Sequence, residues 1–557
     1  MLKKIKNRKV LILLFLLSIP SFSALIRQGY FPMHDDMQAM RLLQIDKCVK
    51  DGQFPCRWVP DMGYGYGYPQ FNYYAPFPYY IMESVHLLGF SYLDSVKASF
   101  IFSVFVGAIG MYILGKKLWG ETGAFISTII FIYAPYRALD MYVRGAVGEF
   151  WALSILPFIF WSSLKVIEED KKARFWLALF IAALLTSHNI TTLVFIPVFL
   201  AWVLYLTFFA LQNSTLSVKS FVKEISFGFL WGFLISSFFI IPAYIEKSYV
   251  HVETLLQGYF NYKGHFASIG QLLFSTYWGF GSSETGSFDD LSLSIGILTW
   301  TIPVSSLFVL FLLKKWKSLK LTLFLVSIGF ISLFLIHPKS EIIWSNVTIL
   351  HYLQFPWRFL VISVFTFSVA AGSLGKLFPG GLRKNIGIIG LIALVSLLLN
   401  ASFFSPHRWI DITDKEKFSG VSWDRQLTIS IFDYLPKSAD RPPWQEAFKM
   451  PVFAEGEGRV IKGLKRTDMQ VWELDVKSES LVRLPIYQFP GWEIKVNDKV
   501  KDYSFDNTLG LITFDLENGS HLVTAKLKNT LVRSLSNIFS VIGLILVPIY
   551  LSKLKLW

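Results

Sequence analysis

Apolar segments long enough to cross a bilayer recur along the whole chain, and they limit its fold more than any other feature. A helix needs roughly 20 apolar residues to cross the hydrocarbon core. About twelve segments approach this length, at residues 10–26, 98–115, 121–135, 150–166, 175–188, 191–209, 225–243, 291–313, 321–336, 358–378, 386–404 and 533–552. Of the 557 residues 53% are hydrophobic and 17% charged, which is too few charges to cover a soluble protein. We therefore predict a polytopic α-helical membrane protein with about twelve transmembrane helices.

Short clusters of basic residues indicate how these helices are oriented. The clusters fall in every second connection, at Lys116 and Lys117, Lys165 to Arg174, Lys219 and Lys223, Lys314 to Lys320, Arg383 and Lys384, and Lys553 and Lys555. Cytoplasmic loops carry such an excess of Lys and Arg. We therefore expect a multi-pass protein of the plasma (cytoplasmic) membrane with both termini in the cytoplasm. The formal net charge of +14 then reflects topology, and no nucleic acid partner is predicted.

The first apolar segment has two interpretations. Basic residues precede it and small residues at Ser21, Ser23 and Ala24 permit cleavage, as in a signal peptide. We prefer an uncleaved anchor, because the segment is about long enough to span a bilayer and more spans follow.

Polar segments divide the chain into domains. Residues 1–404 form the predicted transmembrane domain, which includes an outer loop at 27–96. Residues 405–531 form a predicted extracytoplasmic β domain, and residues 532–557 form a C-terminal transmembrane helix.

The β domain is predicted from alternating polar and apolar residues, as in Val471–Val476 and Leu511–Leu516. Hairpin turns are expected at Asn497-Asp498 and at Asn518-Gly519. These features indicate a small antiparallel sheet or sandwich.

Two adjacent carboxylates, Asp35 and Asp36, follow the first apolar segment closely and precede a helix predicted over Met37 to Asp51. One interpretation is structural, because acidic residues cap helix N-termini. The other is chemical: a carboxylate at the outer membrane surface could act as a general base, or the pair could ligate a divalent cation, Mg²⁺ or Mn²⁺. In the same loop, Cys48 and Cys56 allow at most one disulfide, and two free thiols are an equal alternative.

A run rich in Gly, Tyr and Pro occupies residues 63–80 and includes Tyr74. Its tyrosines favour the headgroup region, and residues 77–89 are predicted to form a short helix lying at the interface. An ordinary aromatic belt is the alternative interpretation. We include Tyr74 among the predicted substrate-binding residues.

Arg144 and Glu149 lie in or beside a short outer connection, residues 136–149, where the distribution of basic residues disfavours arginine. Arg144 could bind the phosphate of a lipid carrier, while Glu149 orients it. A purely structural salt bridge between the two is the alternative.

His34, His188 and Arg358 are weaker candidates for binding substrate or phosphate, because a lone histidine at a membrane boundary is usually an interfacial hydrogen-bonding residue. No His, Cys and acid spacing matches a structural zinc site. No glycine-rich nucleotide fingerprint precedes a helix, so no nucleotide cofactor is predicted.

Several motifs resemble a known family. Gly67-Tyr68-Pro69-Gln70-Phe71-Asn72-Tyr73-Tyr74, Arg144-Gly145 with Glu149, and Phe489-Pro490-Gly491-Trp492 before Val496-Asn497-Asp498-Lys499 resemble bacterial YfhO-like proteins and membrane proteins related to 6-pyruvoyl-tetrahydropterin synthase. The layout of an acidic pair after the first span, an outer loop, many spans and a C-terminal domain resembles GT-C glycosyltransferases, which take sugar from a polyprenyl phosphate carrier.

The resemblance implies an integral membrane hexosyl- or pentosyltransferase that moves a sugar from a polyprenyl-phosphate donor to an extracytoplasmic glycan, lipid or protein acceptor. It implies that Asp35 or Asp36 serves as base or metal ligand, and that Arg144 contacts the phosphate. Several relatives carry Asp-Glu or a lone Asp where this chain has Asp-Asp, which leaves the identity of the base open. The β domain, with Trp444 and Trp492 as exposed aromatic candidates, could hold the acceptor glycan.

Two other functions compete with this one. A transporter or flippase of lipid-linked sugars would place ionisable residues in the middle of spans, whereas most charges here lie at span ends. A non-catalytic assembly protein would use the β domain to bind partners.

Overall fold

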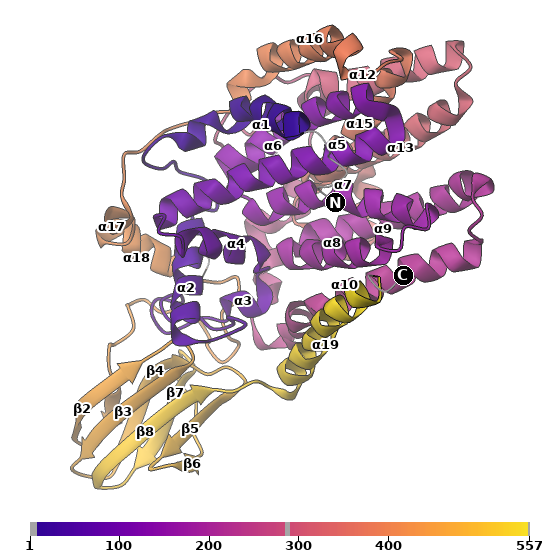
Figure 1. Cartoon of the computed structure of the whole chain (residues 1–557). Coiled ribbons are helices and arrows are strands. Elements are labelled where there is room, and N and C mark those ends of the chain that lie inside the picture. Colours follow the sequence, from indigo (N-terminus) through magenta and orange to yellow (C-terminus); the bar gives the residue numbers. More distant parts are fainter. Residues whose placement is uncertain (1–7, 285–289, 430, 555–557) are drawn as a thin grey trace.

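The computed structural model describes residues 8–284, 290–429 and 431–554, which form a helical body and a β-sandwich (Figure 1). The fold class expected from the sequence, a polytopic helical protein with a C-terminal β domain, is confirmed. The longer helices of the body are α1 (Arg8–Phe22), α5 (Tyr92–Ile132), α7 (Val147–Ile167), α8 (Ala173–Ser187), α9 (Asn189–Tyr205), α10 (Val218–Ile245), α12 (Ile297–Leu312), α13 (Trp316–Ile336), α15 (Leu360–Ala371), α16 (Leu382–Asn400) and α19 (Leu531–Lys553).

Shorter helices occupy the connections. They are α2 (Gln38–Asp51), α3 (Gln70–Tyr73), α4 (Phe77–His86), α6 (Pro135–Leu139), α11 (Ile269–Leu273), α14 (Glu341–Asn346), α17 (Asp414–Lys417) and α18 (Gly420–Thr428). The helices expected over Met37 to Asp51 and residues 77–89 correspond to α2 and α4. Gly52 ends α2 in the left-handed conformation, with φ of 79°.

Nine helices in the described part of the chain are long and apolar enough to cross a membrane, and α8 and α12 are shorter apolar helices. Helix α5 is in fact two helices, because Gly120 interrupts it with a φ of 85°. A Cβ atom built on Gly115 would lie 2.9 Å from Cα of Ala124, whereas nine residues of straight helix span about 13.5 Å. The chain therefore reverses at Gly120, and each of the twelve apolar segments falls on a helix. That all of them span a bilayer remains a prediction.

The basic connections contact one another at one end of the helical body. Lys117 pairs with Glu168, and the Tyr550 hydroxyl donates to the backbone oxygen of Lys171. This grouping fits the expectation that every second connection lies on the same side of the membrane. The assignment of this end to the cytoplasm remains a prediction.

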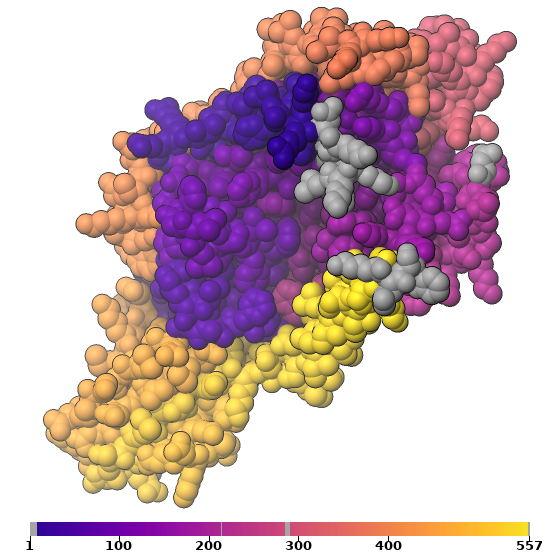
Figure 2. Space-filling model, viewed as in Figure 1, coloured from indigo at the N-terminus to yellow at the C-terminus, as the bar shows by residue number. Residues whose placement is uncertain are grey.

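Eight strands form the sandwich at the opposite end, where it projects from the helical body as a separate lobe (Figure 2). The strands are β1 (Val452–Glu455), β2 (Gly458–Lys465), β3 (Met469–Val476), β4 (Ser480–Tyr487), β5 (Trp492–Val496), β6 (Lys499–Lys501), β7 (Leu511–Leu516) and β8 (Gly519–Leu527). Two antiparallel sheets, ordered β1-β4-β7 and β2-β3-β8-β5-β6, bury one shared apolar cluster that includes Val482 and Phe514 from one sheet and Leu474 and Val523 from the other.

One of the two expected hairpin turns is present. Asn497 and Asp498 join β5 to β6 with φ values of 49° and 64°, as a tight hairpin turn requires. The prediction at Asn518-Gly519 is wrong, because β7 pairs with β4 in one sheet while β8 pairs with β3 and β5 in the other. This turn therefore carries the chain from sheet to sheet.

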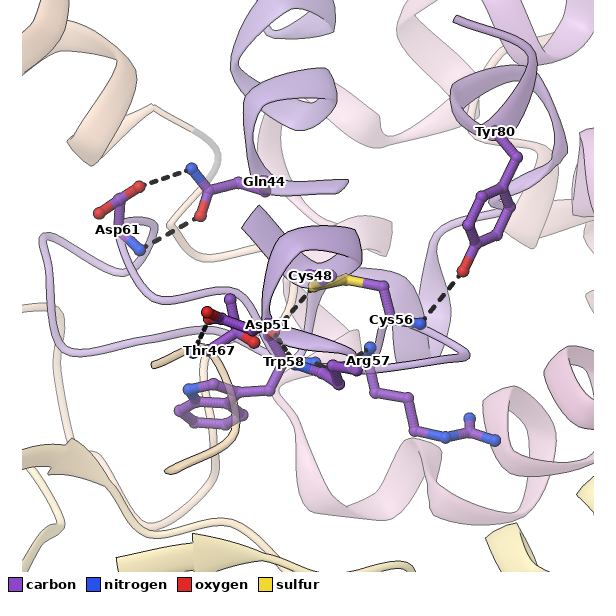
Figure 3. Close-up of a disulfide and its surroundings, with 10 residues drawn as sticks. Gln44, Cys48, Asp51, Cys56, Arg57, Trp58, Asp61, Tyr80 and Thr467 are labelled. Atoms are coloured by element: carbon purple, nitrogen blue, oxygen red, sulfur yellow. Dashed lines mark hydrogen bonds between the residues drawn. A yellow bond between two sulfur atoms is a disulfide. The ribbon is translucent and has the colours of Figure 1, made fainter. Parts of the chain in front are cut away.

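The first outer loop packs into the sandwich. Trp58, Tyr66 and Tyr73 belong to the buried apolar cluster of the β domain. A disulfide joins Cys48 of α2 to Cys56 in the loop that follows this helix (Figure 3). Of the two alternatives that the sequence left open, one bridge or two free thiols, the bridge is therefore the one present. The loop and the sandwich thus form a continuous outer structure.

Two aromatic residues were expected to be exposed on the sandwich. Trp444 is 80% exposed, whereas Trp492 is only 5% exposed. The prediction is therefore confirmed for Trp444 and wrong for Trp492.

Candidate active site

The segment that carries the two acids lies against the second outer connection. The backbone N–H of His34 donates to the oxygen of Val143 at 2.8 Å, and that of Asp35 donates to the oxygen of Arg144 at 3.0 Å. Gly145 follows Arg144 in the left-handed conformation, and a Cβ atom there would lie 2.2 Å from Sδ of Met33. Only glycine permits this close approach, which brings Asp35 beside Arg144.

The Asp35 carboxylate is held by three donors. Arg41 donates to its Oδ2 at 2.6 Å, Gln38 at 3.1 Å and Tyr74 at 3.2 Å. The Arg41 guanidinium also stacks on the Tyr74 ring, 4.2 Å from its centre. These side-chain bonds all end on Oδ2, and the Asp35 side chain remains 32% exposed, so the carboxylate is fixed in orientation and still accessible.

Asp36 has a different environment. Its Oδ2 lies 2.8 Å from Nζ of Lys417, on α17 in the linker before the sandwich. Burial raises the pKa of the Asp36 carboxyl, and Lys417 opposes that shift. Neither acid caps α2, because its N-cap residue is Met37 and no side chain caps that end. The capping interpretation is therefore wrong for both residues.

Arg144 ends a π-helical turn, Asp140–Arg144, in a buried cluster of charges. Its guanidinium lies 2.9 Å from Glu149, bonds to Asp140, and stacks 4.4 Å from the centre of the Trp357 ring. The proposed salt bridge between Arg144 and Glu149 is present.

Two further guanidinium groups adjoin this cluster. Arg358 lies with Nε 4.0 Å from Glu149, and Arg137 interacts electrostatically with Asp140. Burial lowers the pKa of Arg137 to about 9, which still leaves it protonated near neutral pH. The cluster thus contains three guanidinium groups and two carboxylates, those of Asp140 and Glu149. Its formal charge is therefore +1, within the interior of the protein. Such an excess favours an anionic ligand.

The remaining predicted residues border the same cluster. Nδ1 of His188 accepts from the backbone N–H of Thr191 at 3.2 Å, and the imidazole interacts electrostatically with Glu149 and Arg358. Nε2 of His34 lies 3.2 Å from the oxygen of Phe280, and burial lowers the pKa of this histidine.

The structure therefore brings most of the predicted residues together. Arg358 interacts electrostatically with Tyr74, which bonds to Asp35, and thus links the carboxylate to the guanidinium cluster. The residues gathered in this way are His34, Asp35, Tyr74, Arg144, Glu149, His188 and Arg358. Asp36 is separated from them by its pairing with Lys417. The chemical roles of all eight remain predictions.

Sequence reasoning missed Arg41, Asp140 and Trp357. Arg41 could have been found as a charged residue among the buried positions of α2. Trp357 precedes Arg358 directly, but nothing in the sequence indicates that it stacks on Arg144.

The expected divalent cation stays a prediction, because the described residues offer it few free ligands. In the described part of the chain no three His, Cys, Asp or Glu side chains are grouped as a metal site would require. Oδ2 of each acid is already paired with a cationic side chain, Arg41 for Asp35 and Lys417 for Asp36, which leaves one oxygen of each carboxylate for a metal. The base and the guanidinium groups of this site are sufficient for the transfer chemistry without Mg²⁺ or Mn²⁺.

Tyr74, Arg144, Glu149 and His188 all lie in one segment that is similar to a known family. Residues 71–261 match the model of the 6-pyruvoyl-tetrahydropterin synthase related domain, a membrane protein. The resemblance to that family drawn from the sequence is thus confirmed over these residues. A protein of Lactococcus lactis subsp. cremoris (strain MG1363), described as uncharacterized, is 25% identical over 271 residues. That match covers 46% of this chain and 42% of the relative, so the chain matches less than half of the relative's length.

Three solved structures are similar to this chain over about seven-tenths of its length. The arabinofuranosyltransferase AftD from Mycobacteria is 13% identical with a TM-score of 0.45, over 73% of this chain and 28% of that one. ArnT from Cupriavidus metallidurans, bound to undecaprenyl phosphate, is 12% identical with a TM-score of 0.36, over 72% and 68%. The Archaeoglobus fulgidus oligosaccharyltransferase, in complex with zinc and sulfate, is 15% identical with a TM-score of 0.37, over 72% and 53%. These TM-scores are below 0.5, and they assign no function to this chain.

Proposed function

We propose that this membrane protein is a glycosyltransferase that moves a hexosyl or pentosyl group from a polyprenyl-phosphate donor to an extracytoplasmic glycan, lipid or protein acceptor. The observation that supports it best is the position of Asp35, an oriented and accessible carboxylate, beside a buried guanidinium cluster with excess positive charge. A base next to an anion site is the pair of features that such a transfer needs.

The guanidinium cluster would bind the donor through its phosphate. Arg144 and Arg358 would neutralise the charge that grows on the phosphate oxygen as its bond to the anomeric carbon breaks. The electron pair of that bond leaves with polyprenyl phosphate. Because both guanidinium groups are already fixed by Glu149, Trp357 and the backbone oxygen of Leu353, they need no reorganisation at that moment.

Asp35 would act as the general base. Its Oδ1, which receives no hydrogen bond from the described residues, would take the proton of the acceptor hydroxyl while the hydroxyl oxygen bonds to the anomeric carbon. Attack from the face opposite the phosphate inverts the configuration. Asp36 is less suited to this role, because its Oδ2 is paired with Lys417 and its Oδ1 is buried, which leaves no accessible oxygen free to take a proton.

Sugar transfer in proteoliposomes tests this proposal. Purified protein is supplied with a panel of radiolabelled hexosyl- and pentosyl-polyprenyl phosphates and an envelope glycan extract. We expect Asp35→Asn to reduce transfer by about 10²-fold or more, because it keeps the shape of the side chain and removes the base. The matched variant Asp36→Asn should stay within about tenfold of the native protein. Native-level transfer by Asp35→Asn at equal protein content would overturn the catalytic assignment.

The same vesicles separate transfer from translocation. A flippase would move the labelled donor to the opposite leaflet without forming a glycosidic bond. A transporter would place ionisable residues in the middle of spans. The charged groups of this site instead lie at helix ends, because Glu149 is in the first turn of α7 and Arg358 is in the 3-10 turn Pro356–Phe359 just before α15, and this supports transfer.

A further inference from the structure

An apolar groove lies in the side of the helical body between α9 and α10. Helix α8 contacts both of these helices, lies between them and forms the floor of the groove (Figure 1). The volume of the groove is about 490 Å³, and its lining is apolar apart from Thr192 and Ser226. None of the reactions described above uses this groove.

The groove is open along its rim. Leu184 of α8 and Phe195 of α9 are buried and belong to its floor, whereas Leu200 of α9 is 58% exposed and Leu230 of α10 is 62% exposed. Both α9 and α10 are long and apolar enough to cross a membrane, so the rim faces the hydrocarbon layer of the bilayer. A hydrocarbon chain can therefore enter the groove from the side.

One end of the groove reaches the guanidinium cluster. Leu184 and Thr192 line this end, and both bond to His188 through the backbone: the N–H of His188 donates to the oxygen of Leu184 at 3.3 Å, and the N–H of Thr192 donates to the oxygen of His188 at 3.1 Å. The His188 side chain interacts electrostatically with Glu149 and Arg358 of the cluster. The groove thus ends within one helical turn of a residue that borders the candidate anion site.

The groove extends from this end through only part of the bilayer. Along α9 it runs from Thr192 to Val203, which is about 16.5 Å of helix. The hydrocarbon core of a bilayer is about 30 Å thick, so the groove covers roughly half of it. A long lipid chain would therefore lie in the groove only with the part nearest its headgroup.

A lipid with one chain on a phosphate fits this arrangement best. The cluster at the end of the groove has a formal charge of +1, which favours an anion. The apolar lining favours hydrocarbon. A polyprenyl phosphate carries a single chain that would continue from the anion into a groove between two neighbouring helices, whereas an ordinary phospholipid carries two chains.

We propose that the groove between α9 and α10 binds the isoprene units nearest the phosphate of a polyprenyl carrier, and that the protein therefore discriminates among short carriers but not among long ones. The proposal deepens the proposed function, and rests on it in taking the carrier to be the sugar donor. Binding of the carrier requires no transfer and can be measured alone.

The test measures displacement of radiolabelled geranylgeranyl phosphate from the full-length chain in nanodiscs, with each competing lipid at the same mole fraction. Geranylgeranyl phosphate should bind at least about tenfold more tightly than geranyl phosphate, because its additional isoprene units bury more apolar surface. Undecaprenyl phosphate should bind within about threefold of geranylgeranyl phosphate, since the rest of its chain lies outside the groove.

A matched pair of variants assigns this preference to the groove. Ser226 lines the groove and is exposed, so Ser226→Trp fills the groove without disturbing the core, and we expect it to weaken geranylgeranyl phosphate binding roughly tenfold or more. Leu204→Trp is the control, because Leu204 of α9 is 56% exposed and does not line the groove. It should bind as the native chain does.

Affinity that is equal for all three carriers, affinity that keeps rising to undecaprenyl phosphate, or binding that Ser226→Trp leaves unchanged would overturn the proposal. Phosphatidic acid that competes as well as geranylgeranyl phosphate would also overturn it, since the groove would then hold ordinary phospholipid. Groove-dependent binding without sugar transfer by the native chain would refute the proposed function and leave the carrier site standing. Transfer that Ser226→Trp does not change would do the reverse.

Discussion

Arg144 shows how much a single residue of this site depends on its shape as well as its charge. Its planar guanidinium forms an ion pair with Glu149, bonds to Asp140 and stacks on Trp357 at the same time. Lysine carries the same charge as a compact point and cannot reproduce this geometry. Substitution by lysine therefore separates the effect of charge from the effect of orientation.

We predict that Arg144→Lys lowers transfer at limiting donor roughly 10- to 100-fold, because the phosphate contact loses its fixed orientation. The measurement is the initial rate against donor concentration in proteoliposomes. Arg459→Lys is the control, since Arg459 is an exposed arginine that pairs with Asp475 on the β domain. Equal rates for native protein and Arg144→Lys would contradict a role in donor binding.

Glu83 gives a prediction about pH. This residue of α4 is buried, neither of its carboxylate oxygens has a hydrogen-bond partner in the described part of the chain, and Asp46 lies close by. Burial first, and Asp46 second, raise its pKa from 4.5 to about 7. The folded state therefore holds this proton more tightly than the unfolded chain. The contribution of protonated Glu83 to the stability of the fold is complete below about pH 4.5, and it is lost as the pH rises through about 7 and the carboxyl ionises.

We therefore expect Glu83→Gln to stabilise the protein by roughly 1–3 kcal/mol at pH 8, and to leave it nearly unchanged at pH 4.5. The measurement is the thermal unfolding midpoint in detergent across this pH range. Glu446→Gln, at an exposed position, is the control and should show no such dependence. A Glu83→Gln midpoint parallel to the native one at every pH would contradict the prediction.

The sequence identified most of the site residues but could not separate Asp35 from Asp36. Both follow the first apolar segment, and both could cap a helix or serve as a base. Their difference depends on Arg41 and on Lys417, and the latter is 381 residues away from Asp36. Burial of Trp492 likewise depends on Trp58 of the outer loop, which packs edge-on against it. Such distant partners leave no local pattern.

At the scale of elements, periodicity predicted the helices and strands well and their pairing less well. The apolar segments at 98–115 and 121–135 lie in α5 on either side of the reversal at Gly120. The turns at Asn497-Asp498 and Asn518-Gly519 look equally suited to hairpins, yet only the first joins neighbouring strands. Sheet membership is decided by which face each strand buries in the shared core, and this is a property of the assembled domain.

The reversal in α5 gives a prediction at this scale. Gly120 has a φ of 85°, and a Cβ atom added there would meet nothing within 4 Å, so only backbone strain opposes a side chain. We predict that Gly120→Ala destabilises the protein by roughly 1–2 kcal/mol. Gly387→Ala in α16 is the matched control, because its Cβ also meets nothing and its backbone is helical. It should be neutral or slightly stabilising in the same thermal unfolding measurement. Equal destabilisation by both variants would contradict the reversal at Gly120.

The whole molecule is held together by contacts between segments that are far apart in sequence. The linker between helical body and sandwich runs across the outer loop, where Ile410 pairs with Tyr30, Lys417 binds Asp36 and the backbone N–H of Tyr434 donates to the Tyr68 hydroxyl. Because these contacts join the β domain to the loop that carries Asp35, the sandwich and the candidate active site share one rigid support.

A buried ion pair fixes the last helix to that support, and it carries the final prediction. Oε2 of Glu246, just beyond α10, accepts from Nε of Arg533 on α19 and from Nδ2 of Asn72 in the outer loop, each at 2.9 Å. Both charged side chains are almost completely buried. Glu246→Ala would leave Arg533 buried without its counterion, which costs about 3–5 kcal/mol. Asp475→Ala removes the partner of the exposed Arg459 and should cost under about 1 kcal/mol. Thermal unfolding in detergent measures the loss of stability in both variants. A similar small loss in the two would contradict the view that the pair of Glu246 and Arg533 holds the helical body, the outer loop and α19 together.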